Sequence, residues 1–138
     1  MELALALMAD AANTAADGKL NVLGVFDAIN SPTFPVTHPS MVLVLRFDAG
    51  SIDWDTKQDI NIRLINEDGD EILKVNAALV VPRGSDVANR HRFTSQFQIN
   101  GLPLKKPGDY AFDIVVNGER KGQVPLSVRT IDSPSTST

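Results

Sequence analysis

The 138-residue sequence has no cysteine, few aromatic residues and no long hydrophobic run. Without cysteine the chain has no disulfide, no thiolate metal ligand and no cysteine nucleophile, although the cellular compartment stays open. No stretch approaches the roughly 18 uninterrupted apolar residues of a transmembrane helix, so we expect no membrane partner. The net charge of −4 is spread along the chain. It argues against nucleic acid as a partner, because phosphate binding requires concentrated Lys and Arg.

The composition is that of one ordinary globular domain. Hydrophobic residues make up 43% of the chain and charged residues 22%, which is typical of folded proteins. A chain of this length is sufficient for a single buried core. We therefore expect one domain over residues 1–131. The last residues, 132–138, read DSPSTST and are predicted to be a disordered polar tail.

Apolar and polar residues alternate with the period of a β-strand through most of the chain, and no amphipathic helix of ordinary length is visible. Most of the expected strands have one apolar and one polar face. This pattern predicts an all-β fold, an antiparallel β-sandwich of about eight strands, with a closed barrel as the alternative. The expected strands lie in Met1–Ala12 and at Lys19–Asn30, Met41–Phe47, Gln58–Asn66, Glu71–Val81, His91–Asn100, Asp109–Val116 and Glu119–Thr130.

The stretch Lys19–Asn30 is the most hydrophobic of the expected strands on both faces. Two apolar faces predict an interior strand that is covered on both sides. Gly24 lies at its centre, where a glycine indicates a bulge or a close backbone approach. In the last strand Pro125 has no N–H to donate, which predicts an edge strand or a bulge.

Turn residues divide the strands from one another. Asp68-Gly69 and Asn117-Gly118 predict two tight hairpins. The segment Ser31–Ser40 contains three prolines, so we expect an ordered connection rather than a strand. We expect the hydroxyl of Tyr110 to donate a structural hydrogen bond to nearby backbone, as the tyrosine corner of a sandwich does.

Three stretches of the chain, ALMADAANTAADGKLNVLGVFDAI, FPVTHPSMVLVLRF and PGDYAFDIVVNGERKGQVPLSV, resemble a family of short bacterial and phage-encoded proteins of unassigned function. The resemblance implies a compact stand-alone β-sandwich and supplies no catalytic residues. The closing PGDYAFDIVVNGE also resembles the last hairpin of many immunoglobulin-like domains. That second likeness concerns the fold and carries no chemistry.

No catalytic constellation is visible. The G-x-S-x-G turn is missing, and the two histidines, His38 and His91, stand in different contexts. His38 lies between Thr37 and Pro39 and is interpreted as a loop or core-cap residue rather than a general base. We therefore predict that the protein is not an enzyme and needs no cofactor. A hydrolase with an unrecognised site is kept as a further alternative.

The acidic loop 48–59 is the one stretch that suggests a metal. Asp53 and Asp55 are candidate calcium ligands, because hard carboxylate oxygens on sandwich loops bind Ca²⁺. The EF-hand spacing is absent, however, and both residues alternate with Ile52 and Trp54 as solvent-facing positions do. We predict no metal site. A calcium-dependent or small-ligand-binding sandwich that uses this loop is the alternative function.

The most concentrated positive charge in the chain is a basic run that flanks one loop and the start of the expected strand His91–Asn100. Such a run predicts a docking surface for an acidic partner or a phosphate. The alternative interpretation is solvated surface, paired with Asp86 or other acids. The candidate partner-binding residues are Arg83, Arg90, His91 and Arg92.

One face of the expected strand Met41–Phe47 changes character along its length. Val42 and Val44 are followed on the same face by Arg46, so we expect that face to emerge into solvent or to meet a partner. Asp27 shares a face with apolar residues of its own strand. A buried Arg46–Asp27 ion pair is one interpretation, since a charge on a covered face must be paired.

The leading prediction of function is a non-enzymatic protein-interaction or assembly module, located in the cytoplasm or in a phage particle. Exposed sheet edges and two-faced strands favour it, because they can extend a sheet into a neighbour. For the same reason we expect a protein partner and a homo-oligomer.

Overall fold

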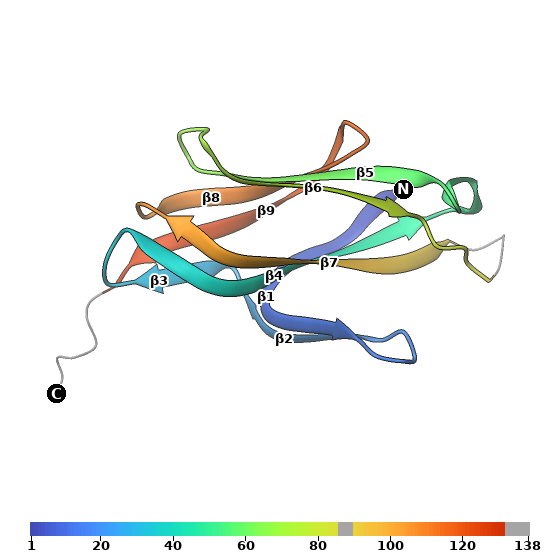
Figure 1. Cartoon of the computed structure of the whole chain (residues 1–138), viewed down its shortest axis with the longest axis horizontal. Helices are drawn as coiled ribbons and strands as arrows, with labels where there is room; N and C mark the ends of the chain where they lie inside the picture. The colour runs from blue at the N-terminus through green and yellow to red at the C-terminus, as the bar shows by residue number, and fades with distance from the viewer. Residues whose placement is uncertain (86–89, 132–138) are drawn as a thin grey trace.

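The computed structural model describes residues 1–85 and 90–131 (Figure 1). The predicted tail at residues 132–138 and the suggested partner Asp86 lie outside the described residues. Within them the chain forms no α-helix, and no helix is long and apolar enough to cross a membrane. The elements are β1 (Glu2–Thr14), β2 (Leu20–Phe26), β3 (Ala28–Ser31), β4 (Val36–Ala49), the 3-10 helix η1 (Ser51–Asp53), β5 (Lys57–Ile65), β6 (Glu71–Val80), β7 (His91–Leu104), β8 (Gly108–Val116) and β9 (Glu119–Thr130).

The strands form two sheets that pack face to face, seen as the lower and upper layers of Figure 1. The first sheet has the order β2-β1-β4-β7 and the second the order β3-β9-β8-β5-β6. The all-β, two-sheet prediction is confirmed, with nine described strands instead of about eight. The expectation of wholly antiparallel sheets is wrong at one pair, because β3 runs parallel to β9.

The core lies between the central strands of the two sheets. Inward residues of β4, β5 and β8 are fully buried, among them Phe47 and Phe112 at 0% exposure. Burying a side chain of this size contributes about 1.5–3 kcal/mol to folding. The largest buried residues also include Met8, Met41, Leu43, Leu45, Ile60, Ile62, Leu64, Leu102, Leu104 and Ile114.

The prediction that Lys19–Asn30 is one interior strand is wrong. The chain leaves the first sheet at Asp27, so β2 forms an outer edge of that sheet and β3 an outer edge of the other. Leu23 and Val25 on β2 are 71% and 61% exposed. The first part of this stretch pairs with β1 and the last part with β9. Alternation of apolar and polar residues alone does not reveal that a strand has changed sheets.

Gly24 marks a close approach, as predicted. It lies in β2 opposite Asp10 of β1, with φ at +71°. A Cβ placed on Gly24 would lie 2.3 Å from Oδ2 of Asp10. Both the backbone conformation and the neighbouring carboxylate therefore require glycine.

The β1–β2 hairpin folds across the outer face of the first sheet. β1 pairs with β4 from Glu2 to Ala9 and then continues with β2 alone as far as Thr14. We call residues 10–26 the hairpin arm. At its tip Gln96 Nε2 of β7 donates to Thr14 Oγ1 at 3.2 Å. The arm covers β4 with a second, smaller cluster made of Ala9, Val42 and Val44, packed by Leu7, Ala12, Leu20 and Val22.

The segment Ser31–Ser40 is not wholly a connection, because β4 begins at Val36. His38 is therefore a strand residue that pairs with Leu102, and its ring lies 5.8 Å from that of Phe26. Pro39 is tolerated because β1 pairs with β4 only beyond this point, which leaves one side of the strand without a neighbour. Of the two interpretations of His38, a loop or a core-cap residue, the loop is wrong for this reason.

Both predicted hairpin turns are confirmed. Asp68-Gly69 joins β5 to β6, and Asn117-Gly118, with φ values of +50° and +82°, joins β8 to β9. The prediction of an edge strand or a bulge at Pro125 is wrong, because β9 lies between β3 and β8; the proline is tolerated because β3 pairs with β9 only from Ser127 onward.

The hydroxyl of Tyr110 donates a hydrogen bond to the backbone oxygen of Lys106 at 2.7 Å, as predicted. The side chain is 4% exposed, so this bond satisfies a buried polar group. We expect Tyr110→Phe to lower the free energy of unfolding by about 1 kcal/mol, the usual contribution of one such bond. Urea denaturation measures it, and an unchanged midpoint with an unchanged slope would contradict the structural role.

Candidate binding surface at the open side of the sandwich

The sandwich is open along the side where β6 and β7 form the outer edges of the two sheets (Figure 1). β6 pairs with β5 alone, and β7 with β4 alone. Each strand therefore has one side whose N–H and C=O groups pair with no strand of the described chain. Unpaired edges of this kind are templates for an added strand.

The inward side chains along this opening are incompletely covered. Phe93 and Phe97 of β7 are half-buried, whereas Phe47 and Leu43, their neighbours on β4, are fully buried. The same contrast holds between β6 and β5. We call the half-buried set the apolar band; it consists of Leu73, Val75, Ala77, Leu79, Phe93 and Phe97.

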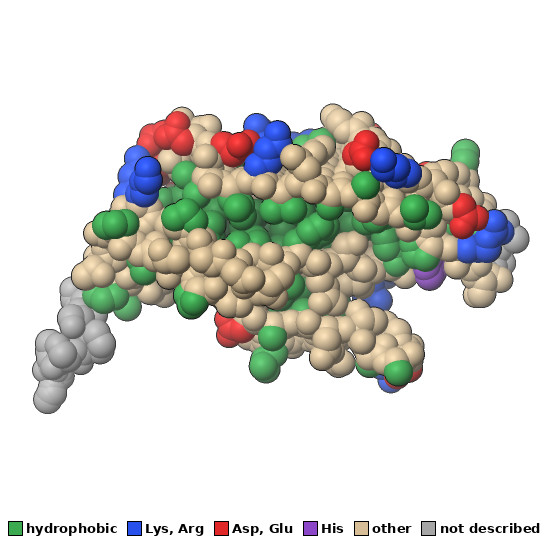
Figure 2. Space-filling model, viewed as in Figure 1, with side chains coloured by type: hydrophobic (Ala, Val, Ile, Leu, Met, Phe, Trp, Pro, Cys, Tyr) green, Lys and Arg blue, Asp and Glu red, His purple; other side chains and the backbone are tan. Residues whose placement is uncertain are grey.

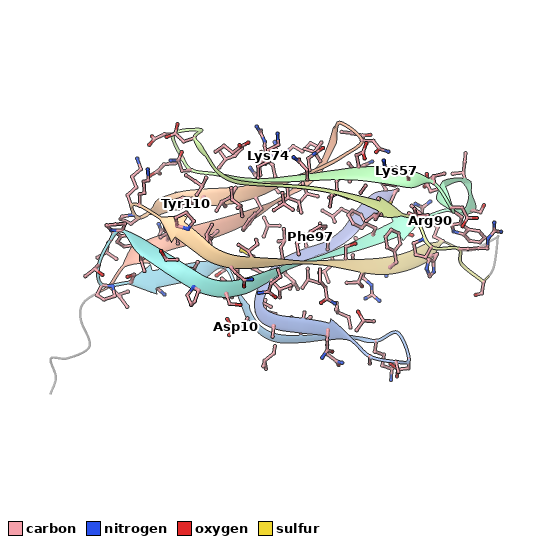
Figure 3. The ribbon with its side chains drawn as sticks, in the orientation of Figure 1. Asp10, Lys57, Lys74, Arg90, Phe97 and Tyr110 are labelled. Carbon is pink, nitrogen blue, oxygen red and sulfur yellow. The ribbon has the colours of Figure 1, made fainter. Side chains whose placement is uncertain are left out.

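Figure 2 shows this band as hydrophobic side chains between the two layers, and Figure 3 shows Phe97 pointing from β7 toward the other sheet. Lys74 lies on the opposite, outer face of β6. A segment that entered the opening would meet apolar side chains below and free backbone groups at its sides. The band can therefore bind an extended chain by both hydrophobic contact and hydrogen bonds.

One end of the opening is a hollow of about 530 Å³, with both polar and apolar residues in its lining. Lys106 Nζ lies there at 2.6 Å from Oδ2 of Asp68. The hydrogen bond from this ammonium to Asp68 is the largest influence that raises the pKa of Lys106. The hollow is lined by Asn66, Asp70, Glu71, Ile72, Pro103, Lys105, Lys106 and Tyr110.

At the other end the structure brings the acidic loop and the basic run together. Arg83 forms an ion pair with Asp55, and its guanidinium carbon lies 5.9 Å from the ring centroid of Trp54. Arg90 Nε lies 3.0 Å from Oδ1 of Asp48. Two of the candidate partner-binding arginines are thus paired within the chain. This agrees with the alternative interpretation of the basic run as solvated surface paired with nearby acids, which here are Asp55 and Asp48.

The other members of the basic run point in different directions. His91 belongs to the inward face of β7, and its ring stacks near that of Phe93 at 6.3 Å. Arg92 is exposed and lies opposite Asp48 in the β4–β7 ladder. The run therefore surrounds the end of β7 instead of forming one surface.

The calcium candidates are engaged by cations. The α-amino group of Met1 lies 3.1 Å from Oδ2 of Asp53, while Asp55 is held by Arg83. Over residues 1–85 and 90–131, no group of three or more His, Cys, Asp or Glu side chains is placed to hold a metal ion. Whether the loop binds calcium stays a prediction, which is tested below.

The suggested Arg46–Asp27 pair is wrong. No ion pair among the described residues joins them, because Asp27 lies exposed at the crossover from β2 to β3, while Arg46 lies in β4 opposite Leu5 and Thr94. Nε of Arg46 is buried and has no hydrogen-bond partner within residues 1–85 and 90–131, and the same is true of His38 Nε2 and Trp54 Nε1.

The two histidines occupy opposite ends of one ladder. His38 pairs with Leu102, whereas His91 pairs with Ala49. The described residues therefore do not bring them into a shared site.

Sequence reasoning did not identify the apolar band. Each of its strands shows the alternation of a half-buried strand, and the pattern was interpreted as core. The signal that distinguishes an open edge from a closed core is the strand order, which alternation does not contain.

The fold and this surface define a two-sheet all-β domain with one open side. The chain belongs to a family of unknown function (DUF6941), whose model matches residues 4–129. No curated protein matches it.

Among solved structures, the Pseudomonas fluorescens alkylpurine DNA glycosylase AlkC bound to DNA containing an abasic site analog is similar over 75% of this chain, at 14% identity and a TM-score of 0.44. The similar region is 27% of that chain, so this sequence spans about a quarter of its length. The likeness is too small to carry an argument about function.

We expect about 5 mM Ca²⁺ to leave the melting temperature unchanged, because Asp53 and Asp55 are already paired with cations and a bound ion would have to displace them. Differential scanning fluorimetry with Mg²⁺ as the matched ion measures this. A rise in melting temperature with Ca²⁺ alone, abolished by Asp55→Asn, would revive the calcium alternative.

Proposed function

We propose that the protein is a non-enzymatic interaction module that binds an extended segment of a partner protein along the open side of the sandwich. The observation that carries the proposal is the combination of two free strand edges with the half-buried apolar band between them. Either feature alone is common. Together they offer the two kinds of contact that strand addition uses.

The recognised segment is expected to be an added strand of the second sheet, hydrogen-bonded to β6. Every second side chain of such a strand turns inward. Those side chains would contact Phe93 and Phe97, which β6 leaves half-buried, and would shield both rings from solvent. We therefore expect ligands with apolar residues at alternate positions and few charges between them.

The basic run is the less favoured docking surface. Arg83 and Arg90 are engaged by Asp55 and Asp48, so an acidic partner would compete with ion pairs already formed within the chain. Exposed pairs of this kind are worth little each, but they remove the excess positive charge that would attract the partner. Two finer predictions accompany this proposal. One is that the sandwich is immunoglobulin-like, and the other is that the protein is located in the cytoplasm or in a phage particle.

The proposal is tested with a displayed library of random peptides of about twelve residues, a length that covers one strand edge. We expect selected peptides to alternate apolar and polar residues. On titration they should shift the backbone amide resonances of β6 and β7. Phe97→Ser should weaken binding roughly tenfold or more, since it removes a large apolar contact.

Two further variants make the result decisive. Ala77→Trp fills the band without removing apolar surface, and it should also block binding. Val25→Ser changes an exposed apolar residue of β2, outside the band, and should leave the affinity unchanged. Peptides that bind Phe97→Ser and Ala77→Trp as well as wild type, or that shift only the residues around Arg83 and Arg92, would overturn the proposal.

A further inference from the structure

The outer edge of β2 has a self-complementary pattern of side chains. We propose that two copies of this chain pair through antiparallel β2 edges and so form a symmetric dimer with one continuous sheet. The inference does not rest on the proposed function, because β2 lies in the first sheet at the margin opposite β7.

The exposed face of this edge combines apolar and charged residues. Leu23 and Val25 are 71% and 61% exposed. Among the large hydrophobic residues of the four edge strands, only Val80, at 62%, is similarly exposed. Leu20 and Val22 turn the other way, into the cluster under the hairpin arm. Lys19 and Asp27 directly flank β2 at its two ends, and Asn21 completes the alternation within the strand.

Symmetry restricts how the edge can meet a copy of itself. In a two-fold pair of antiparallel strands each residue must oppose one on the same face. Centring the pair on Leu23 places it opposite Leu23 of the second copy. Continued by one residue beyond each end of β2, the same register places Lys19 opposite Asp27 of the second copy, at both ends of the interface. The interface would thus have one Lys–Asp attraction at each end and the two Leu23 side chains at its centre.

The charges are available for this contact. Lys19 reaches Asp17 at 3.7 Å, but both side chains are strongly exposed, at 83% and 59%. Such a pair is worth little and is easily exchanged. Among the ion pairs of the described residues none engages the carboxylate of Asp27.

The other three edges lack this complementarity. On β6, the register shift opposite Leu64 and Ile65 places Glu71 and Lys74 on the same outer face, but the carboxylate of Glu71 is already paired with Arg63 of the neighbouring strand at 3.7 Å. β7 carries Arg92 and no acidic residue. β3 has four residues, which is short for an interface.

The β2 edge is exposed at Leu23 and Val25, and it ends at Asp27, whose carbonyl oxygen accepts a hydrogen bond from the backbone N–H of Ser127 in β9 at 2.9 Å. In Figure 1 the hairpin arm extends below the first sheet, and β2 lies at the lower margin of the molecule, away from β5 and β6. A second copy could therefore join β2 while the apolar band between β6 and β7 stays free. Dimerisation and partner binding are separable for this reason.

The test is sedimentation equilibrium of the full chain at up to about 100 μM, a range that detects micromolar association. Wild type should be a dimer. Lys19→Asp and Asp27→Lys each turn two attractions into two repulsions, and each should weaken the dimer about tenfold. Both residues are exposed, so the variants should fold, which circular dichroism verifies.

Mixing the two single variants gives the sharpest readout. Lys19→Asp carries two negative ends and Asp27→Lys two positive ends, so the mixture should associate as a heterodimer to within about threefold of the wild-type affinity. The combined Lys19→Asp/Asp27→Lys chain should also regain self-association. Lys74→Asp, on the outer face of β6, is the matched control and should leave the dimer unchanged.

A wild-type chain that stays monomeric at the highest concentration would overturn the proposal. So would a dimer that is indifferent to both charge reversals, or one that the mixture of single variants fails to restore.

Discussion

The structure depends on the burial of β4 on both faces. Its inward residues, Leu43 and Phe47 among them, meet the second sheet, and its outward Val42 and Val44 are 3% and 0% exposed beneath the hairpin arm. A strand of this kind cannot lie at a surface, because removing one buried aliphatic side chain costs about 2–5 kcal/mol. The chain must therefore supply a cover on each side. The second sheet supplies one cover, and residues 10–26 supply the other.

The two uncovered edges of the first sheet follow from this arrangement. Once the hairpin arm is committed to the outer face of β4, β2 becomes the outermost strand on one side and β7 on the other. The second sheet ends at β6 on the side of β7, and residues 1–85 and 90–131 supply no further strand that closes the opening. The apolar band and the β2 edge are therefore consequences of one packing requirement.

Local chemistry accounts for the parts of the fold that the sequence predicts. The turns at Asp68-Gly69 and Asn117-Gly118 and the hydrogen bond of Tyr110 depend on residues close in the chain. Alternation also identifies the all-β class, because it reports which faces are buried. It does not report what buries them. The face of Val42 and Val44 was expected to emerge or meet a partner, and the partner is an arm of the same chain.

Long-range pairing explains the rest. The crossover at Asp27 divides one apparent strand between two sheets, and nothing in its local pattern distinguishes that from an interior strand. The acidic loop and the basic run looked like separate candidate sites, but Asp48 and Arg90 meet because β4 pairs with β7. The band was hidden for the same reason, since its strands become edges only through the strand order.

Hydrogen exchange of the backbone amides, followed by NMR on the free protein, tests the open side most directly. In an edge strand alternate amides point away from the sheet. Along β6 and β7 we therefore expect fast and slow exchange to alternate, while the amides of β5, paired on both sides, exchange slowly throughout their ladders. Uniform protection along β6 or β7 would mean that the edge is already paired, and it would contradict the account of an open, binding-competent side.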